Sequence, residues 1–303
     1  YSRWARKYLG VDQGSRRTCY NDLGGVITVD PIVKDFEGDL DKISSQLDFI
    51  DIVRKFTASV PEQADAGAAS PFSIEAIAVH EGAKRVHGNL PLASGTLILY
   101  TCGRFEAMTR TLFEDLCQRL VARAGHFNRL PKKMRENLPI FTAKVISDPR
   151  KHGHAENGVR AFVATLASNL AVDAKIERVN HECLSLTDSN MRADVLGDLF
   201  ARVGTNNIWA QISEQASLKM YFQEGDSGKV ETKARKKLND LMDLRNRIAH
   251  PSGELEWPST DALREYIAFL RLLARSIADL VGVFEVTLCV PAVAEQKSAP
   301  QVQ

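Results

Sequence analysis

Apolar side chains recur every three or four residues along most of this 303-residue chain, which is the spacing of an α-helix and not of a strand. The clearest case is LASGTLILYTCGRFEAMTRTLFEDLCQRLVARAG, residues 92–125, whose apolar residues predict a helix buried on more than one side. The preceding segment, residues 71–91, fits either a short strand or a helix. Because no alternation of strand and helix patterns is present, the sequence predicts an all-α helical bundle.

Capping residues mark the beginnings of two further helices. Ser189 or Asn190 can cap a helix that ends at Gly204. Ser259 or Thr260 can cap the last strong helix of the chain. The buried stripe of that last helix is expected to consist of Leu263, Ile267, Leu270, Leu273, Ile277 and Leu280.

The two ends of the chain differ from its centre. Residues 1–35 are rich in glycine and hold one β-like run, 26–29, ended by Asp30-Pro31, which reads as a leader, a linker or an extra strand. We therefore predict an irregular N-terminal extension or linker over 1–35. A helical domain should follow over 36–285, with a disordered tail over 286–303.

Composition excludes several classes of protein. A formal net charge of +1 gives no global attraction to nucleic acid, so any binding of phosphate must come from local clusters. The longest apolar runs fall far short of the roughly 20 residues that span a bilayer, so we expect no membrane partner.

The cysteines and histidines favour a reducing compartment and no metal. The five cysteines are scattered and form no C-x-x-C pair, which argues against a disulfide framework and a cysteine zinc site. Free thiols fit a cytoplasmic location, and Cys102 and Cys117 are expected to be core residues. The pair His152 and His154, like His181 and Cys183 in the HEC stretch, is more typical of plain loop residues than of metal ligands. We expect no cofactor.

The stretch DLMDLRNRIAHPSGE, residues 240–254, contains the side chains best suited to catalysis. On an ideal helix the Cβ atoms of Arg245 and His250 diverge by about 140°. Pro251 disfavours the α conformation for the residue before it. We therefore predict that His250 is the last helical residue or already lies outside the helix, where its imidazole can be aimed differently.

This pairing of side chains suits the cleavage of RNA. Attack by a 2′-hydroxyl needs a general acid/base that titrates near neutrality, which histidine supplies. It also needs a fixed cation at the pentavalent phosphate, and the planar guanidinium of arginine matches phosphate oxygens. The alternative is a surface Arg245 and a terminal His250 that caps the last carbonyls of the helix.

A family resemblance makes the first interpretation specific. RNRIAH matches the R-x4-6-H motif of HEPN-domain ribonucleases, including the polar Asn246 after the arginine. With SLTDSNMRADVLGDLFARVG, LMDLRNRIAHPSGE and LYTCGRFEAMTRTLFEDL, it resembles the MAE_28990/MAE_18760-like (RiboL-PSP-type) HEPN branch over roughly residues 40–285. Pro251 departs from the glycine that is common in the family.

The resemblance implies a HEPN-like bundle and a metal-independent endoribonuclease. His250 would be the general acid/base, Arg245 would hold the scissile phosphate, and Asn246 would be auxiliary. The products would carry 2′,3′-cyclic phosphate and 5′-hydroxyl ends. It also implies a homodimer with a shared cleft, and a toxin or effector role in bacterial antiviral defence, alone or beside an antitoxin. We expect the Leu-rich face of the motif helix or of the last helix to form the dimer interface.

Other charged residues are candidates for a supporting role. Glu106 lies within an apolar helix and either orients His250 or Arg245 or reaches solvent. Arg247 points about 200° away from Arg245, which favours a surface or dimer contact. The run KARKK either steers RNA or is a solvated helix face. Its basic residues are Lys233, Arg235, Lys236 and Lys237.

The alternative function is a non-catalytic HEPN module that binds RNA or a protein partner within a larger defence complex.

Overall fold

The computed structural model describes residues 30–59, 71–152, 156–172, 174–251 and 257–289. Within these ranges every regular element is a helix, and the β pairing that occurs is an isolated bridge between His126 and Lys175. The all-α prediction is confirmed. The helices are α2 (Pro31–Ala58), α3 (Pro71–Val86), η1 (His87–Asn89), α4 (Leu90–Ala124), η2 (Phe127–Arg129), α5 (Lys132–Ser147), α6 (Glu156–Asn169), α7 (His181–Leu184), α8 (Ala193–Ala201), α9 (Ile208–Ser213), α10 (Ala216–Phe222), α11 (Ser227–Ala249) and α12 (Thr260–Thr287).

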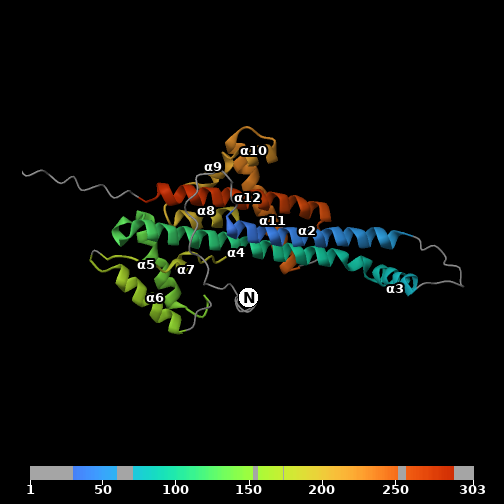
Figure 1. Ribbon diagram of the computed structural model, residues 1–303, viewed down its shortest axis with the longest axis horizontal. Coiled ribbons are helices and arrows are strands. Elements are labelled where there is room, and N and C mark those ends of the chain that lie inside the picture. The colour runs from blue at the N-terminus through green and yellow to red at the C-terminus, as the bar shows by residue number, and fades with distance from the viewer. Residues whose placement is uncertain (1–29, 60–70, 153–155, 173, 252–256, 290–303) are drawn as a thin grey trace, which may run out of the picture.

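A bundle of long helices forms the centre of the molecule. Figure 1 shows α2, α4 and α12 side by side along the long axis, and each packs against the other two. Helix α4 also packs against α11, α7 and α8, so it is buried on several sides as predicted. Helix α3 continues beyond one end of the bundle, while α5 packs with α6 and α7.

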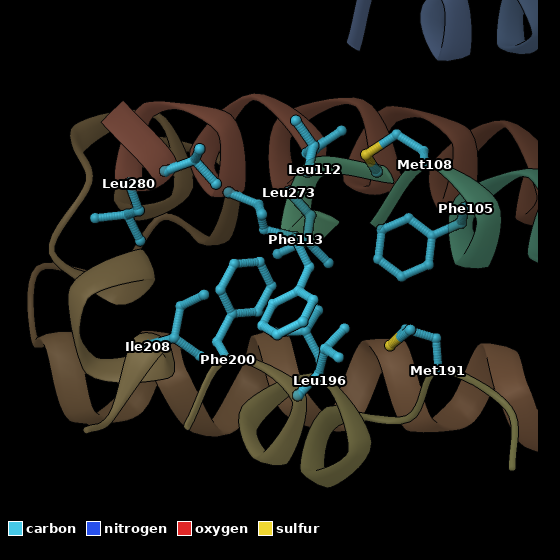
Figure 2. Close-up of a cluster of buried hydrophobic side chains, with 14 of the residues drawn as sticks. Phe105, Met108, Leu112, Phe113, Met191, Leu196, Phe200, Ile208, Leu273 and Leu280 are labelled. Atoms are coloured by element: carbon cyan, nitrogen blue, oxygen red, sulfur yellow. The ribbon is translucent and has the colours of Figure 1, made fainter. Parts of the chain in front are cut away.

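The core lies where α4 and α12 meet α8 and α11. Figure 2 shows Phe113 of α4 against Phe200 of α8, and the two rings meet edge to face with centroids 5.6 Å apart. The stripe predicted for the last helix is buried along its whole length. Its N-cap is Ser259, whose hydroxyl accepts the N–H of Ala262 at 3.1 Å.

The first described helix begins earlier than its apolar period indicated. Asp30 caps α2 by accepting the N–H of Ile32 at 2.8 Å, and Pro31 occupies the first helical position. A proline there is compatible with a helix because its missing N–H would have no partner in the first turn. The Asp30-Pro31 pair therefore starts a helix in the structure, whereas we expected it to end a β-like run. That run itself, 26–29, lies outside the described residues.

Two local expectations are decided by the fold. The ambiguous segment at 71–91 is helical, since it forms α3, η1 and the start of α4. The capping prediction for Ser189 or Asn190 was wrong, because α8 begins only at Ala193. The N–H of Ala193 instead donates to the side-chain oxygen of Asn239 on α11, at 2.9 Å. The side chain of Asn239 therefore caps the N-terminus of α8 from another helix.

The described cysteines behave as small core residues. Cys102, Cys117, Cys183 and Cys289 are free and buried, while Cys19 lies outside the described residues. Burial raises the pKa of the Cys102 and Cys183 thiols to about 12. In the described part of the chain, no helix combines the length and apolar character needed to cross a membrane.

Candidate active site

Helix α11 places Arg245 at the edge of the core. Its N-cap is Asp226, and its apolar stripe includes Leu238 and Leu241, both fully buried. Arg245 follows Leu241 by four residues, so it continues this stripe by one more turn. Its side chain is half-buried at the end of the core instead of extending freely into solvent.

The guanidinium of Arg245 lies near α4. Burial has the largest effect on the Cys102 thiol and raises its pKa, while the positive charge of Arg245 opposes that rise. The carboxylate of Glu106, one turn further along α4, raises the same pKa. The charge of Arg245 therefore acts on the middle of α4, against which α11 packs.

His250 leaves the helix at the residue before Pro251. Its backbone has φ −133° and ψ 67°, outside the helical region, although its N–H still donates to the carbonyl of Asn246 at 3.0 Å. The prediction that His250 is the last helical residue or already outside is confirmed. Its side chain is exposed, so the imidazole is accessible to a ligand.

Asn246 joins the arginine to a distant part of the chain. Its side-chain oxygen accepts Nη1 of Arg245 at 3.2 Å. The same oxygen accepts Nδ2 of Asn190 at 2.5 Å. The auxiliary residue of the motif is therefore a shared acceptor that connects Arg245 with the segment between α7 and α8.

That segment, residues 185–192, which we call the α7–α8 linker, runs along α11. Positions 235, 239, 243 and 246 of α11 follow one another at about one helical turn and so lie on one face. The end of the linker and the first turn of α8 run antiparallel to this face and contact it at each of these positions. The pairs are Asp194 with Arg235, the Ala193 N–H with Asn239, Arg192 with Asp243, and Asn190 with Asn246.

The linker is also fixed from the opposite side. Arg202 donates to the carbonyl oxygens of Leu184 and Leu186, which bracket the start of the linker. The hydroxyl of Thr187 accepts a hydrogen bond from Arg110 of α4. Helices α4 and α11 therefore hold the same irregular segment between them.

The basic run of α11 is matched by carboxylates. Lys233 contacts Glu224 at 3.3 Å, Lys236 contacts Asp240 at 2.7 Å, and Lys237 contacts Glu265 at 3.4 Å. Arg235 binds Asp194 at the start of α8. These residues are not gathered around Arg245 or His250 by any of these contacts. A role for them in holding RNA remains a prediction.

Glu106 has a partner on its own helix. Its carboxylate contacts Nη2 of Arg110 at 2.6 Å, and Arg110 in turn donates to the linker. The contact found for Glu106 is thus an ion pair within α4, and a role in orienting His250 or Arg245 stays a prediction. Within the ranges that the structure describes, no cluster of three or more His, Cys, Asp or Glu side chains could hold a metal ion.

Sequence reasoning missed the linker contacts, above all Asn190. A signal for them was present in α11, where Asn239, Asp243 and Asn246 follow Arg235 at helical spacing and form a polar face. Polar side chains at that spacing are ordinary on a solvated helix, so the pattern alone did not distinguish solvent from a bound segment.

Trp257 anchors the chain on the far side of His250. Its ring packs against Gly95 of α4, and a Cβ at residue 95 would overlap the six-membered ring. Gly95→Ala is therefore expected to displace Trp257 and to lower the free energy of unfolding by about 1–3 kcal/mol. Urea denaturation followed by circular dichroism measures the change.

Gly103→Ala is the matched control for this substitution. Gly103 lies on the same helix with open space around it, so an added methyl group meets nothing. Alanine in place of glycine there should raise the stability of α4 by about 0.5–1 kcal/mol. Equal stability of the Gly95→Ala and Gly103→Ala proteins would show that the position of Trp257 does not require glycine at residue 95.

The fold and the site define a class: an all-α bundle that ends one helix with an arginine, an asparagine and a histidine. The chain belongs to the RiboL-PSP-HEPN family, which matches residues 77–282. The matched region holds the whole R-x4-H motif and α4, while α2 precedes it. No curated protein and no solved structure matches the chain significantly.

Proposed function

We propose that this protein is a metal-independent endoribonuclease. One observation carries the proposal: at the end of α11, in a HEPN-family chain, Arg245 is oriented by Asn246 while His250 leaves the helix with an exposed imidazole. An oriented guanidinium and an accessible imidazole in one motif supply the two kinds of group that cleavage by a 2′-hydroxyl requires.

The reaction follows from the chemistry of these groups. Neutral His250 takes the proton of the 2′-hydroxyl, and the 2′-oxygen attacks the adjacent phosphorus. Arg245 stabilises the negative charge that builds up on the phosphate oxygens. The bond from phosphorus to the 5′-oxygen then breaks, and the imidazolium of His250 gives up the proton it took, which passes through water to the leaving 5′-oxygen. The products are a 2′,3′-cyclic phosphate and a 5′-hydroxyl.

A homodimer remains part of the proposal, with a different interface from the one we expected. The Leu-rich faces of α11 and α12 are buried within the same chain, including Leu238 and Leu273, which have no exposed area. They cannot also cover a second copy unless the bundle opens, so the earlier interface prediction was wrong. Another surface must join the copies in a dimer with a shared cleft.

The biological setting that fits such an enzyme is bacterial defence. We propose a cytoplasmic toxin or effector whose activity is restrained by an antitoxin or by a partner in a defence complex. The family supports a nuclease or RNA-binding role. The toxin role, the partner and the compartment are our proposals.

The decisive experiment is cleavage of a structured RNA in the presence of EDTA, followed by end-group analysis. Wild-type protein should cut the RNA and leave 2′,3′-cyclic phosphate and 5′-hydroxyl ends. The His250→Ala protein, purified in the same way, controls for contaminating ribonucleases and should leave the RNA intact.

Other outcomes of this experiment point elsewhere. Equal cleavage by both proteins would place the activity outside His250. Intact RNA with both proteins, together with retention of the RNA in a gel-shift assay, would favour the non-catalytic HEPN module. Products with 3′-hydroxyl ends would contradict attack by the 2′-hydroxyl.

A further inference from the structure

We infer that Asn190 is a positioning residue for Arg245, acting through Asn246; this inference rests on the proposed function. Asn190 lies in the α7–α8 linker, 56 residues before Asn246 in sequence. Its Nδ2 donates to Oδ1 of Asn246 at 2.5 Å, and Nη1 of Arg245 donates to the same oxygen at 3.2 Å. Asn190 therefore belongs to the motif in space though not in sequence.

The shared oxygen explains how Asn190 acts at a distance. An asparagine amide can rotate by 180° and exchange its oxygen for its NH₂ group, which donates and cannot accept. With two donors aimed at one position, the rotamer that presents the oxygen is strongly favoured. Without Asn190, one of these donors is lost, and the acceptor that orients the Arg245 guanidinium is less firmly fixed.

Asn190 is itself held firmly. Its neighbour Met191 is fully buried, and Figure 2 shows this side chain among the core residues. Its carbonyl accepts the N–H of Arg192 at 2.7 Å, and Arg192 binds Asp243 on α11. A side chain between a buried residue and an ion-paired residue has little freedom to move, which suits a positioning role.

Asn239 supplies a matched comparison on the same helix face. Its side-chain oxygen accepts a hydrogen bond from the N–H of Ala193, the residue that follows the linker, at 2.9 Å. It lies nearly two turns before Arg245 and has no hydrogen bond to it among the described contacts. Loss of either asparagine removes one bond between this segment and α11, but only Asn190 reaches the motif.

The test compares Asn190→Ala with Asn239→Ala in steady-state cleavage. Asn190→Ala should lower kcat by about 10–100-fold with KM within about threefold, because a misplaced group costs rate more than binding. Asn239→Ala should destabilise the protein and leave kcat within about twofold. Asn190→Ser keeps a donor and should recover part of the lost rate. Equal kcat values for the two alanine variants would overturn the inference.

A double-variant cycle separates positioning from general disruption. If Asn190 acts through Asn246, adding Asn190→Ala to Asn246→Ala should change kcat by less than about twofold, since residues in one network are not additive. Multiplying effects in the double variant would mean that Asn190 acts by another route, and the inference would fail.

One readout does not depend on cleavage. The Nε–Hε signal of Arg245 in a ¹H–¹⁵N spectrum can be assigned by its loss in Arg245→Ala. It should shift or broaden in Asn190→Ala and stay unchanged in Asn239→Ala. An inactive wild-type protein would refute the proposed function only, whereas an unchanged signal in Asn190→Ala would refute the positioning role.

Discussion

Arg245→Ala is expected to lower kcat for RNA cleavage by about 10²–10³-fold, with a smaller change in KM. Loss of one fixed donor to a developing oxyanion costs about this much in other enzymes. The half-buried guanidinium is oriented by Asn246 and close to α4, so a flexible cation from solvent cannot replace it. Single-turnover cleavage of a short RNA measures the effect.

Arg247→Ala controls for the loss of positive charge. Arg247 lies on the same turn, is exposed, and points away from Arg245 by about 200°. Arg247→Ala should change kcat by less than about threefold. His250→Ala, which removes the general acid/base, should lower kcat by about 10²–10⁴-fold. Similar losses for Arg245→Ala and Arg247→Ala would indicate general electrostatic attraction of RNA, and the assignment of Arg245 would be wrong.

Trp209→Ala is expected to have the largest effect on stability, about 3–5 kcal/mol in the free energy of unfolding. Trp209 is 2% exposed and belongs to α9, which packs against α8 and α11. Its Nε1 donates to the carbonyl of Ala193 at 2.7 Å, and its ring lies within 5.9 Å of the Arg235 guanidinium. The substitution leaves a cavity in the core and removes the hydrogen bond to the carbonyl of Ala193. Urea unfolding at equilibrium gives the change.

Trp209→Phe separates the ring from the hydrogen bond. Phenylalanine fills most of the same volume but cannot donate, so the loss should fall to about 1–3 kcal/mol. Both variants also remove a contact of Ala193, the residue at which α8 begins after the linker. Stability of Trp209→Ala within about 1 kcal/mol of the wild type would show that this part of the core repacks freely.

The helices could be predicted because their apolar period survives in the structure. Helices α4 and α12 carry the stripes that the spacing indicated, and these stripes are the residues that fill the core. Boundaries were harder where two kinds of signal compete. At Asp30-Pro31 the same residues can end a strand or begin a helix, and only the chain that follows decides.

The sequence could predict the site residues on α11 but not their partners elsewhere in the chain. Pro251 and the spacing of the motif were sufficient to place His250 outside the helix. Asn190 was interpreted as a cap because a polar residue before an apolar period usually has that role. Its actual partner lies 56 residues away, and no local pattern encodes such a pairing. The same is true of Arg235, which binds Asp194 across 41 residues.

The α7–α8 linker has a consequence for the order in which the protein is made. Asn190 is synthesised 56 residues before Asn246, which is roughly 3–11 s of translation at about 5–20 residues per second. Helix α12 must then follow to cover α4 and α2. A nascent or truncated chain that lacks α12 leaves the faces of α4 and α2 that α12 covers exposed, so the helix against which α11 packs is not yet fixed. We therefore expect the site to become ordered only after α12 has left the ribosome.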